Sequence, residues 1–111
     1  MRELTLAEEK RLLRVSRNIA KELGIDDLIF ERLVWTDGSG PALNKAAIQQ
    51  LKSLIKIYES LHTLFSDRTQ ANGWLHKPNG RFDNKTALDV IYSDPGTQLK
   101  VVADYLVYQC T

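Results

Sequence analysis

The side chains of this 111-residue chain that could carry chemistry are few and lie far apart in the sequence. His62 and His76 are the only histidines, and Cys110 is the only cysteine. A metal or catalytic site needs several such groups at defined spacing, commonly three or four side chains of His, Cys, Asp or Glu. We find no set of that kind around either histidine. We therefore predict that both histidines serve the fold and that the protein is not an enzyme and carries no metal or other cofactor.

A group of cations on the first expected helix, residues 5–23, is the next candidate. The cations are Lys10, Arg11, Arg14, Arg17 and Lys21. A basic stripe of this kind could contact nucleic-acid phosphates. It is also what a solvated helix face looks like, because Glu8, Glu9 and Glu22 partly balance it. Both readings remain open at this point.

Residues 20–35 look like a helix-turn-helix unit, since a turn containing Gly24 joins two helices. The second of these helices is poorly suited to reading DNA. It carries a single cation, Arg32, and three acidic residues, Asp26, Asp27 and Glu31. A helix that reads the major groove needs Arg, Lys, Asn or Gln on its outer face. We expect a degenerate helix-turn-helix that packs against the rest of the protein.

Composition places the chain among soluble globular proteins. Hydrophobic residues make up 43% and charged residues 26%, and the formal net charge is +1. The low charge argues against a strongly electrostatic nucleic-acid binder. A single cysteine excludes an intramolecular disulfide, and no apolar run approaches the ~20 residues of a membrane span. We expect a cytoplasmic protein without a membrane partner.

The longest amphipathic pattern, residues 43–65, predicts a central helix with a broad apolar arc. One line of apolar residues recurs at helical spacing: Ala47, Leu51, Leu54, Tyr58, Leu61 and Phe65. The opposite face is predicted to be polar: Lys45, Gln49, Lys52, Ser53, Lys56, Glu59, Ser60 and Thr63. Because the arc covers about half of the helix circumference, other helices should pack on it from two sides.

Capping signals predict the remaining helices. Thr5 with Glu8, and Thr86 with Asp89, have the spacing of capping boxes. Asn44 is of a residue type preferred at the N-cap and is predicted to cap the central helix. The first helix should bury the line Leu12, Val15, Ile19 and Leu23. Turn-forming residues at 36–41 suggest a boundary between an N-terminal helical region, residues 1–40, and a second region, residues 41–111. The expected fold class is all-α, a small helical bundle.

The last helix, which begins near Pro95, has apolar residues on two sides. Leu99, Val102, Ala103 and Leu106 form one line, suited to the core. Val101, Tyr105 and Tyr108 form a second line on nearly the opposite side. This second line could be covered by the first helix or by another protein, and tyrosine is enriched in protein interfaces.

Four segments together resemble the toxin-binding domain of the Xre/MbcA/ParS antitoxins, over residues 43–106. They are Leu61–Phe65, Ala71–Asn79, Lys85–Ile91 and Val102–Leu106. The combination of Trp-Leu-x-x-Pro-Asn with Lys-Thr-x-Leu-Asp is more specific than either motif alone. The chain departs from the family pattern at Asp83-Asn84, where glycines are common, and at Ala87, where proline is common.

The resemblance implies a bacterial antitoxin of a type II toxin–antitoxin system. Its cognate toxin would carry a RES domain that degrades NAD, or a related ADP-ribosylating activity, and the antitoxin would cover the toxin's active-site cleft with its C-terminal region. The antitoxin would form a homodimer, or a hetero-oligomer with the toxin. The toxin-binding residues that the resemblance implies are Tyr105, Leu106, Tyr108, Gln109, Cys110 and Thr111, with Trp74, Asn79 and Lys85 in the supporting surface. The second apolar line of the last helix adds Val101 to the predicted toxin-binding residues.

Many members of this family also repress their own operon through a helix-turn-helix. The alternative function is therefore a dimeric transcriptional repressor. Its DNA contacts would have to come from Lys10, Arg14, Arg17 and Lys21, because the second helix of the unit is acidic and apolar.

Overall fold

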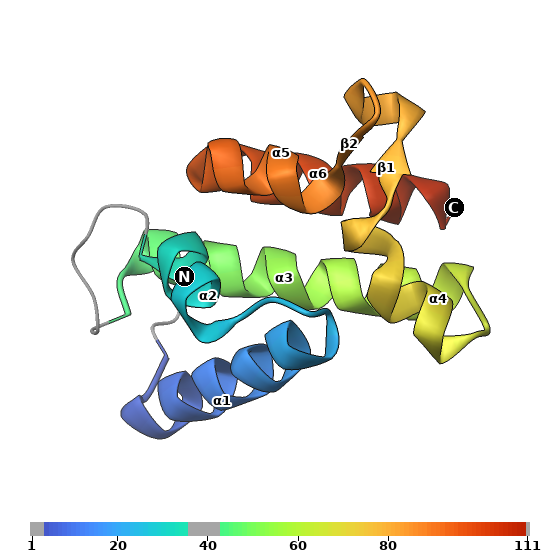
Figure 1. Ribbon diagram of the computed structural model, residues 1–111. Coiled ribbons are helices and arrows are strands. Elements are labelled where there is room, and N and C mark those ends of the chain that lie inside the picture. Colours follow the sequence, from blue (N-terminus) through green and yellow to red (C-terminus); the bar gives the residue numbers. More distant parts are fainter. Residues whose placement is uncertain (1–3, 36–42, 111) are drawn as a thin grey trace.

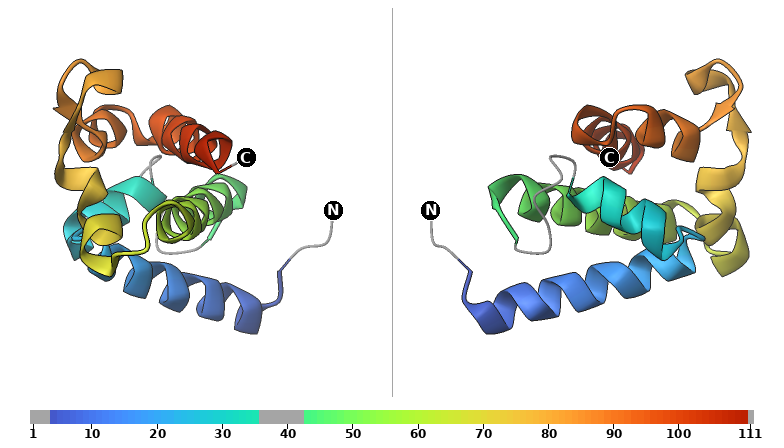
Figure 2. Two further views of the ribbon diagram at one scale, coloured as in Figure 1. Left: turned by 90° about the vertical axis from the view of Figure 1, so that its right-hand side faces the viewer. Right: turned by 60° about the vertical axis from the view of Figure 1, so that its left-hand side comes forward.

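The longest helix, α3 (Lys45–Leu64), lies between α1 (Leu6–Glu22) and α6 (Pro95–Gln109), which pack on opposite sides of it (Figures 1 and 2). The computed structural model describes residues 4–35 and 43–110. Within these residues it is all-α apart from one two-stranded sheet, as the sequence predicts. None of the described helices is long and apolar enough to cross a membrane.

The shorter elements complete the bundle around α3. α2 (Asp27–Val34) packs against α1 and α3. The chain between α3 and α6 forms the elements α4 (Arg68–Gly73), η1 (Trp74–His76), β1 (Pro78–Asn79), η2 (Gly80–Phe82), β2 (Lys85–Thr86) and α5 (Ala87–Ser93), where η denotes a 3-10 helix.

The helices begin at the residues that the capping signals predict. The Thr5 hydroxyl accepts a hydrogen bond from the Glu8 amide at 3.1 Å, and the Glu8 carboxylate accepts one from the Thr5 amide at 3.0 Å. This reciprocal pair confirms the capping box. Asn44 and Thr86 likewise accept hydrogen bonds from the third amide of α3 and of α5. These local contacts satisfy amides that an isolated helix end leaves without partners.

A hairpin formed by β1, η2 and β2 connects η1 to α5. Pro78 pairs with Thr86, and Asn79 pairs with Lys85, in antiparallel register. Strands of two residues leave no alternating pattern to read. The turn holds Asp83 at φ 55° and Asn84 at φ 65°, in the left-handed region. Asp and Asn tolerate this region better than other non-glycine residues, so this turn forms without glycine at either position.

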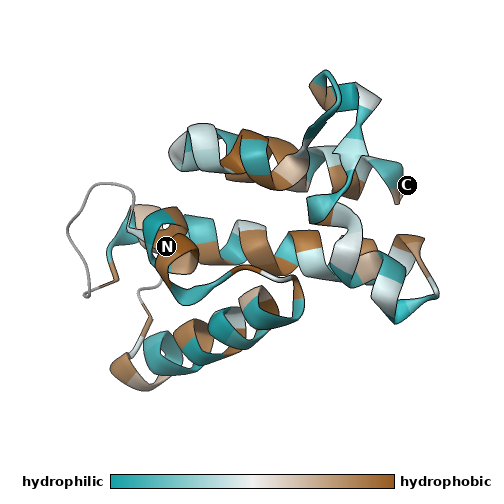
Figure 3. Cartoon of the chain, viewed as in Figure 1, coloured by the Kyte–Doolittle hydropathy of each residue, from teal (hydrophilic) through white to brown (hydrophobic). Residues whose placement is uncertain are grey.

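The buried face of α1 differs from the predicted line. Ile19 and Leu23 are buried, but Val15 is 41% exposed and the neighbouring Ser16 is fully buried. Ser16, Ile19, Ala20 and Leu23 share one face at helical spacing, and Figure 3 shows hydrophobic and hydrophilic bands alternating along α1. A small side chain at position 16 lets α1 approach the neighbouring helices closely, which the hydrophobicity of Val15 did not indicate.

Replacing Ser16 with alanine is expected to stabilise the protein by about 1 kcal/mol. The Ser16 hydroxyl is buried and has no hydrogen-bond partner in the described residues. Alanine removes that unsatisfied group and has the higher helix propensity. Chemical denaturation followed by circular dichroism measures the change, and the exposed Asn18→Ala variant is the control for helix propensity alone. A Ser16→Ala gain no larger than that of Asn18→Ala would show that the buried hydroxyl is not costly.

The side of α3 that the sequence marks as polar is partly buried. Ser53 is 8% exposed and Ser60 is 6% exposed, so the prediction of an outward-facing position is wrong for both. The cause is α6, which packs along this side of α3. Small side chains at these positions allow two helix backbones to come close together.

A polar cluster ties the end of α1 to α3 and α4. The Glu22 carboxylate accepts hydrogen bonds from the Tyr58 hydroxyl and the Arg68 guanidinium. These bonds lower the pKa of Glu22, and the bond to the carboxylate raises the pKa of Tyr58. The side chain of Arg68 is 70% exposed, so this ion pair positions α4 more than it stabilises the fold.

Candidate partner-binding surface

α6 presents one face to the core and another to the solvent. Leu99, Val102, Ala103 and Leu106 are each at most 1% exposed, as the sequence predicts. On the opposite side Val101 is 48% exposed and Tyr108 is 75% exposed. We call Val101, Tyr105 and Tyr108 the α6 outer face. Its residues recur at spacings of four and three, so they lie on one side of the helix.

Tyr105 is half-buried, and the residues that cover it come from η1 and η2. Its ring stacks with that of Trp74, with centroids 6.5 Å apart and an interplanar angle of 22°. Phe82 meets the same ring edge-on at 6.1 Å, and the Arg81 guanidinium carbon lies 5.3 Å from its centroid. Trp74, Phe82 and Tyr105 form what we call the aromatic cluster. The first helix, which packs against α2 and α3, is not what covers Tyr105.

The aromatic cluster fixes the hairpin against α6. Trp74 and Phe82 also contact each other edge-on, with centroids 6.3 Å apart. Aromatic pairs in this geometry contribute about 0.5–1.5 kcal/mol beyond their buried area. Phe82 was not among the predicted site residues, because in the sequence it stands alone in a polar segment. Only its place in the hairpin brings it to Tyr105.

The other predicted contact residues occupy different environments. Lys85 is exposed on β2, and the Asn79 side chain accepts a hydrogen bond from the Arg81 amide at 2.9 Å, which shapes the hairpin. Gln109 and Cys110 are exposed at the end of α6. Thr111 lies outside the described residues. The prediction that Leu106 contacts the toxin is wrong, because its side chain is 1% exposed in the core and is not available to a partner.

Comparison with known families identifies this part of the chain. Residues 60–107 match the family model of the antitoxin Xre/MbcA/ParS C-terminal toxin-binding domain. The match covers 48 of the 111 residues, and over them the chain is similar to that family. The match confirms the resemblance predicted from the sequence, and it covers the C-terminal part of α3 and nearly all of α6. The matched segment thus contains the whole aromatic cluster and most of the α6 outer face.

One curated relative has no assigned function. The uncharacterized protein y4oB of Sinorhizobium fredii is 28% identical over 68 residues, which is 61% of this chain. The match spans 53% of the relative, so the chain covers about half of that protein's length. No solved structure matches the chain significantly.

The basic stripe ahead of the toxin-binding domain is partly used within the protein. The Arg17 guanidinium lies 3.7 Å from the Asp27 carboxylate and 4.9 Å from the centroid of the Phe30 ring. Arg17 therefore helps to hold α2 on α1. Lys10, Arg14 and Lys21 are exposed on α1. Of the four predicted DNA-contacting residues, one already has an intramolecular ion pair.

Both histidines have partners within the fold. The His62 Nε2 atom lies 2.8 Å from the Asn72 Oδ1 atom, in hydrogen-bonding contact. The His76 Nε2 atom donates a hydrogen bond to the Leu23 carbonyl at 2.8 Å and so connects η1 to the end of α1. Each histidine has the structural role that the sequence predicted. Within residues 4–35 and 43–110 no three side chains of His, Cys, Asp or Glu are placed to hold a metal ion.

Proposed function

We propose that the protein is the antitoxin of a type II toxin–antitoxin pair and that it acts by binding its toxin. The family of residues 60–107 supports the antitoxin role. The sequence resemblance further points to a toxin with a RES domain that degrades NAD, or with a related ADP-ribosylating activity. In this proposal the protein covers the active-site cleft of the toxin and contributes no catalysis of its own.

The observation that carries the proposal is the α6 outer face. Val101 and Tyr108 expose 48% and 75% of their surface on a helix whose opposite side is fully buried. A helix anchored in this way holds its exposed residues in fixed positions, which lowers the entropic cost of binding. Exposed Tyr and Val side chains on one face supply the kind of apolar and aromatic area that partner interfaces bury.

The aromatic cluster and the hairpin extend this surface. Tyr105 is held by Trp74 and Phe82, so its remaining exposed edge has a defined orientation. Arg81 over the Tyr105 ring and the exposed Lys85 add positive charge beside the apolar face. We infer that the toxin contacts the α6 outer face first and the hairpin at its margin, with the residues after Tyr108 entering the cleft.

Co-expression with the adjacent gene tests the proposal. We expect the neighbouring gene product to arrest growth by itself and this protein to restore it. The double variant Val101→Asp and Tyr108→Asp should bind the toxin at least about 100-fold more weakly and fail to restore growth, because both charges would be buried in the interface. Tyr105 is left unchanged, since its ring also supports the hairpin.

The control for this experiment is Leu6→Asp, which places the same charge on a 68% exposed leucine of α1. It should restore growth as well as the native protein. Circular dichroism should show equal helix content for all three proteins. Full rescue by the double variant would show that toxin binding does not use the α6 outer face. If the neighbouring gene product does not arrest growth, it is not a toxin and the antitoxin proposal is wrong for this pair.

A further inference from the structure

Three arginine side chains lie over aromatic rings in the part of the chain that the structure describes. The distances from guanidinium carbon to ring centroid are 4.9 Å for Arg17 over Phe30, 5.0 Å for Arg32 over Tyr92 and 5.3 Å for Arg81 over Tyr105. The attraction of a cation for the face of a ring restricts where the guanidinium can lie. Its five N–H donors are not used by this contact. The role of each arginine therefore depends on what these donors bind.

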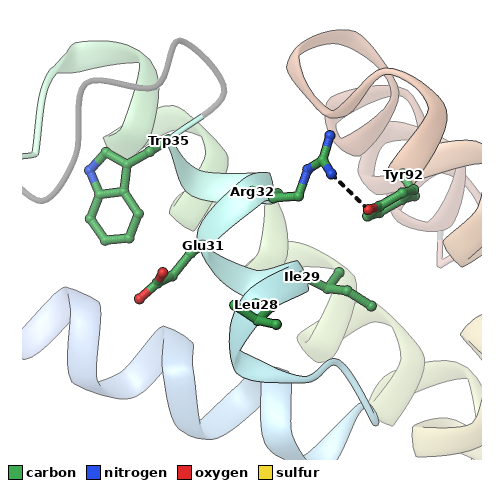
Figure 4. A pocket seen from close by; sticks show the side chains of 6 residues that line it. All are labelled: Leu28, Ile29, Glu31, Arg32, Trp35 and Tyr92. Atoms are coloured by element: carbon green, nitrogen blue, oxygen red, sulfur yellow. Dashed lines mark hydrogen bonds between the residues drawn. The ribbon is translucent and has the colours of Figure 1, made fainter.

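Two of these arginines bind acceptors that belong to the fold. The Arg17 guanidinium lies 3.7 Å from the Asp27 carboxylate, in an ion pair between α1 and α2. The Arg32 guanidinium donates a hydrogen bond to the Tyr92 hydroxyl at 3.0 Å, which Figure 4 shows as a dashed line between α2 and α5. Both arginines thus join neighbouring helices of the bundle.

Arg81 has no such acceptor in residues 4–35 and 43–110. It is exposed, and its guanidinium makes no hydrogen bond or ion pair with any residue of these two segments. Its place over the Tyr105 ring puts it at the edge of the α6 outer face, to which Tyr105 belongs. The fold therefore positions this guanidinium and leaves its donors available to an acceptor from outside the chain.

The backbone that carries Arg81 is held on both sides. The Asn79 side chain accepts a hydrogen bond from the Arg81 amide at 2.9 Å, and Asn79 pairs with Lys85 across the hairpin. The next residue, Phe82, meets the Tyr105 ring edge-on, with centroids 6.1 Å apart. An arginine placed by its backbone and by its side chain loses less freedom on binding than an unconstrained one.

The charges around Arg81 favour an anionic group on the partner. Residues 77–85 carry one carboxylate, Asp83, and three cations, Lys77, Arg81 and Lys85. On α6, the Asp104 carboxylate accepts a hydrogen bond from the Lys100 ammonium at 2.8 Å, so it is already paired. The margin of the α6 outer face at the hairpin is therefore positive, and a negative group of the partner complements it.

We propose that Arg81 binds a carboxylate of the toxin in a bidentate pair and that this pair makes the interface specific. The inference rests on the proposed function and names the chemistry of the toxin at the margin of the interface. A guanidinium and a carboxylate match through two parallel hydrogen bonds, which an ammonium cannot form. A related toxin without a carboxylate at this point would leave the guanidinium covered and unpaired, which lowers its affinity.

Toxin binding by the purified full chain tests the pair, with association and dissociation rates measured by biolayer interferometry. Arg81→Gln should raise the dissociation constant at least about 30-fold, mainly through faster dissociation, because the toxin carboxylate stays buried without its partner. Arg81→Lys keeps the charge and should still weaken binding about tenfold, because the second parallel bond is lost.

Arg32→Gln is the matched control, since it removes another guanidinium that lies over a tyrosine ring, outside the α6 outer face. It should leave the dissociation constant within about twofold. Lys85→Gln removes a neighbouring exposed cation and should slow association by less than about threefold. Circular dichroism verifies that each variant is folded. An unchanged dissociation constant for Arg81→Gln, or an equal loss for Arg32→Gln, would overturn the inference and leave the antitoxin proposal standing, whereas a native chain that does not bind the toxin would overturn both.

Carbodiimide coupling identifies the acceptor, since it joins a lysine amine to a carboxylate in contact with it. In the toxin complex of the Arg81→Lys variant, mass spectrometry should find a cross-link from position 81 to an Asp or Glu of the toxin. The native complex should lack this cross-link. Exchanging the charges, with Arg81→Glu in this chain and an arginine at that toxin position, should recover the binding that each change alone removes. A variant complex without the cross-link, or a loss of affinity in Arg81→Gln that appears only with a nucleotide bound to the toxin, would show that the acceptor is not a toxin carboxylate.

Discussion

Replacing Gly24 with alanine is expected to lower the free energy of unfolding by about 3 kcal/mol. Gly24 follows α1 with φ at +77°, in the left-handed region, and the Ile25 amide closes the helix end on the Ala20 carbonyl at 2.8 Å. A Cβ atom at position 24 would also lie 2.5 Å from the His76 Nε2 atom. The imidazole could make room for this Cβ atom only by giving up its hydrogen bond to the Leu23 carbonyl.

The two causes of this loss can be separated by a double-mutant cycle. Gly24→Ala and His76→Ala are measured alone and together by chemical denaturation. In the background without the imidazole, only the backbone penalty of about 1–2 kcal/mol should remain for Gly24→Ala. An equal penalty in both backgrounds would show that the contact with His76 costs nothing. Gly73→Ala is the matched control, since nothing lies within 4 Å of its added Cβ atom, and it should be neutral or slightly stabilising.

The elements of this fold that the sequence predicted correctly are those defined by local signals. Thr5, Asn44 and Thr86 cap their helices through contacts three residues away. Pro95 begins α6 in the first turn, where the missing amide is not needed. The buried residues of α6, Leu99, Val102, Ala103 and Leu106, follow from helical spacing alone. Such features depend on neighbours in the sequence, so a single sequence is enough to find them.

The errors arise where distant helices decide burial. Hydrophobicity predicted Val15 inside and Ser53 and Ser60 outside, but α1 turns its Ser16 side to the core and α6 closes over the two serines. Small residues at helix crossings are buried because backbones approach each other there. Their polarity gives the opposite signal in a sequence. The boundary predicted between residues 40 and 41 lies outside the described residues.

The candidate site was predicted correctly where local helical spacing decides it and was missed where distant segments decide it. Val101 and Tyr108 lie on the solvent side of α6 because the core line fixes the rotation of the helix. The aromatic cluster depends on a hairpin with two-residue strands, which left no readable pattern. Consequently the sequence identified Tyr105 as part of an apolar face but did not show that Trp74 and Phe82 cover its ring.

Replacing Gln50 with leucine is expected to lower the free energy of unfolding by about 2–3 kcal/mol. Gln50 is 6% exposed, and its side-chain nitrogen donates hydrogen bonds to the Leu33 carbonyl at 2.9 Å and to the Pro95 carbonyl at 2.7 Å. The Leu33 carbonyl is in the last turn of α2, where no helical amide is available to it. Leucine fills a similar volume but leaves buried acceptors without this donor.

The neighbouring Gln49 provides the matched control, because it is exposed on the same helix. Gln49→Leu should change stability by less than about 0.5 kcal/mol. Hydrogen exchange should show where Gln50→Leu acts. One side-chain amide joins the end of α2 to the start of α6, so protection should fall in α2 and in the first turn of α6 together. A loss confined to α2 would mean that the Pro95 carbonyl does not need Gln50, and that the packing of α6 on α3 and α5, with the aromatic cluster, is enough to hold the helix that carries the proposed toxin-binding face.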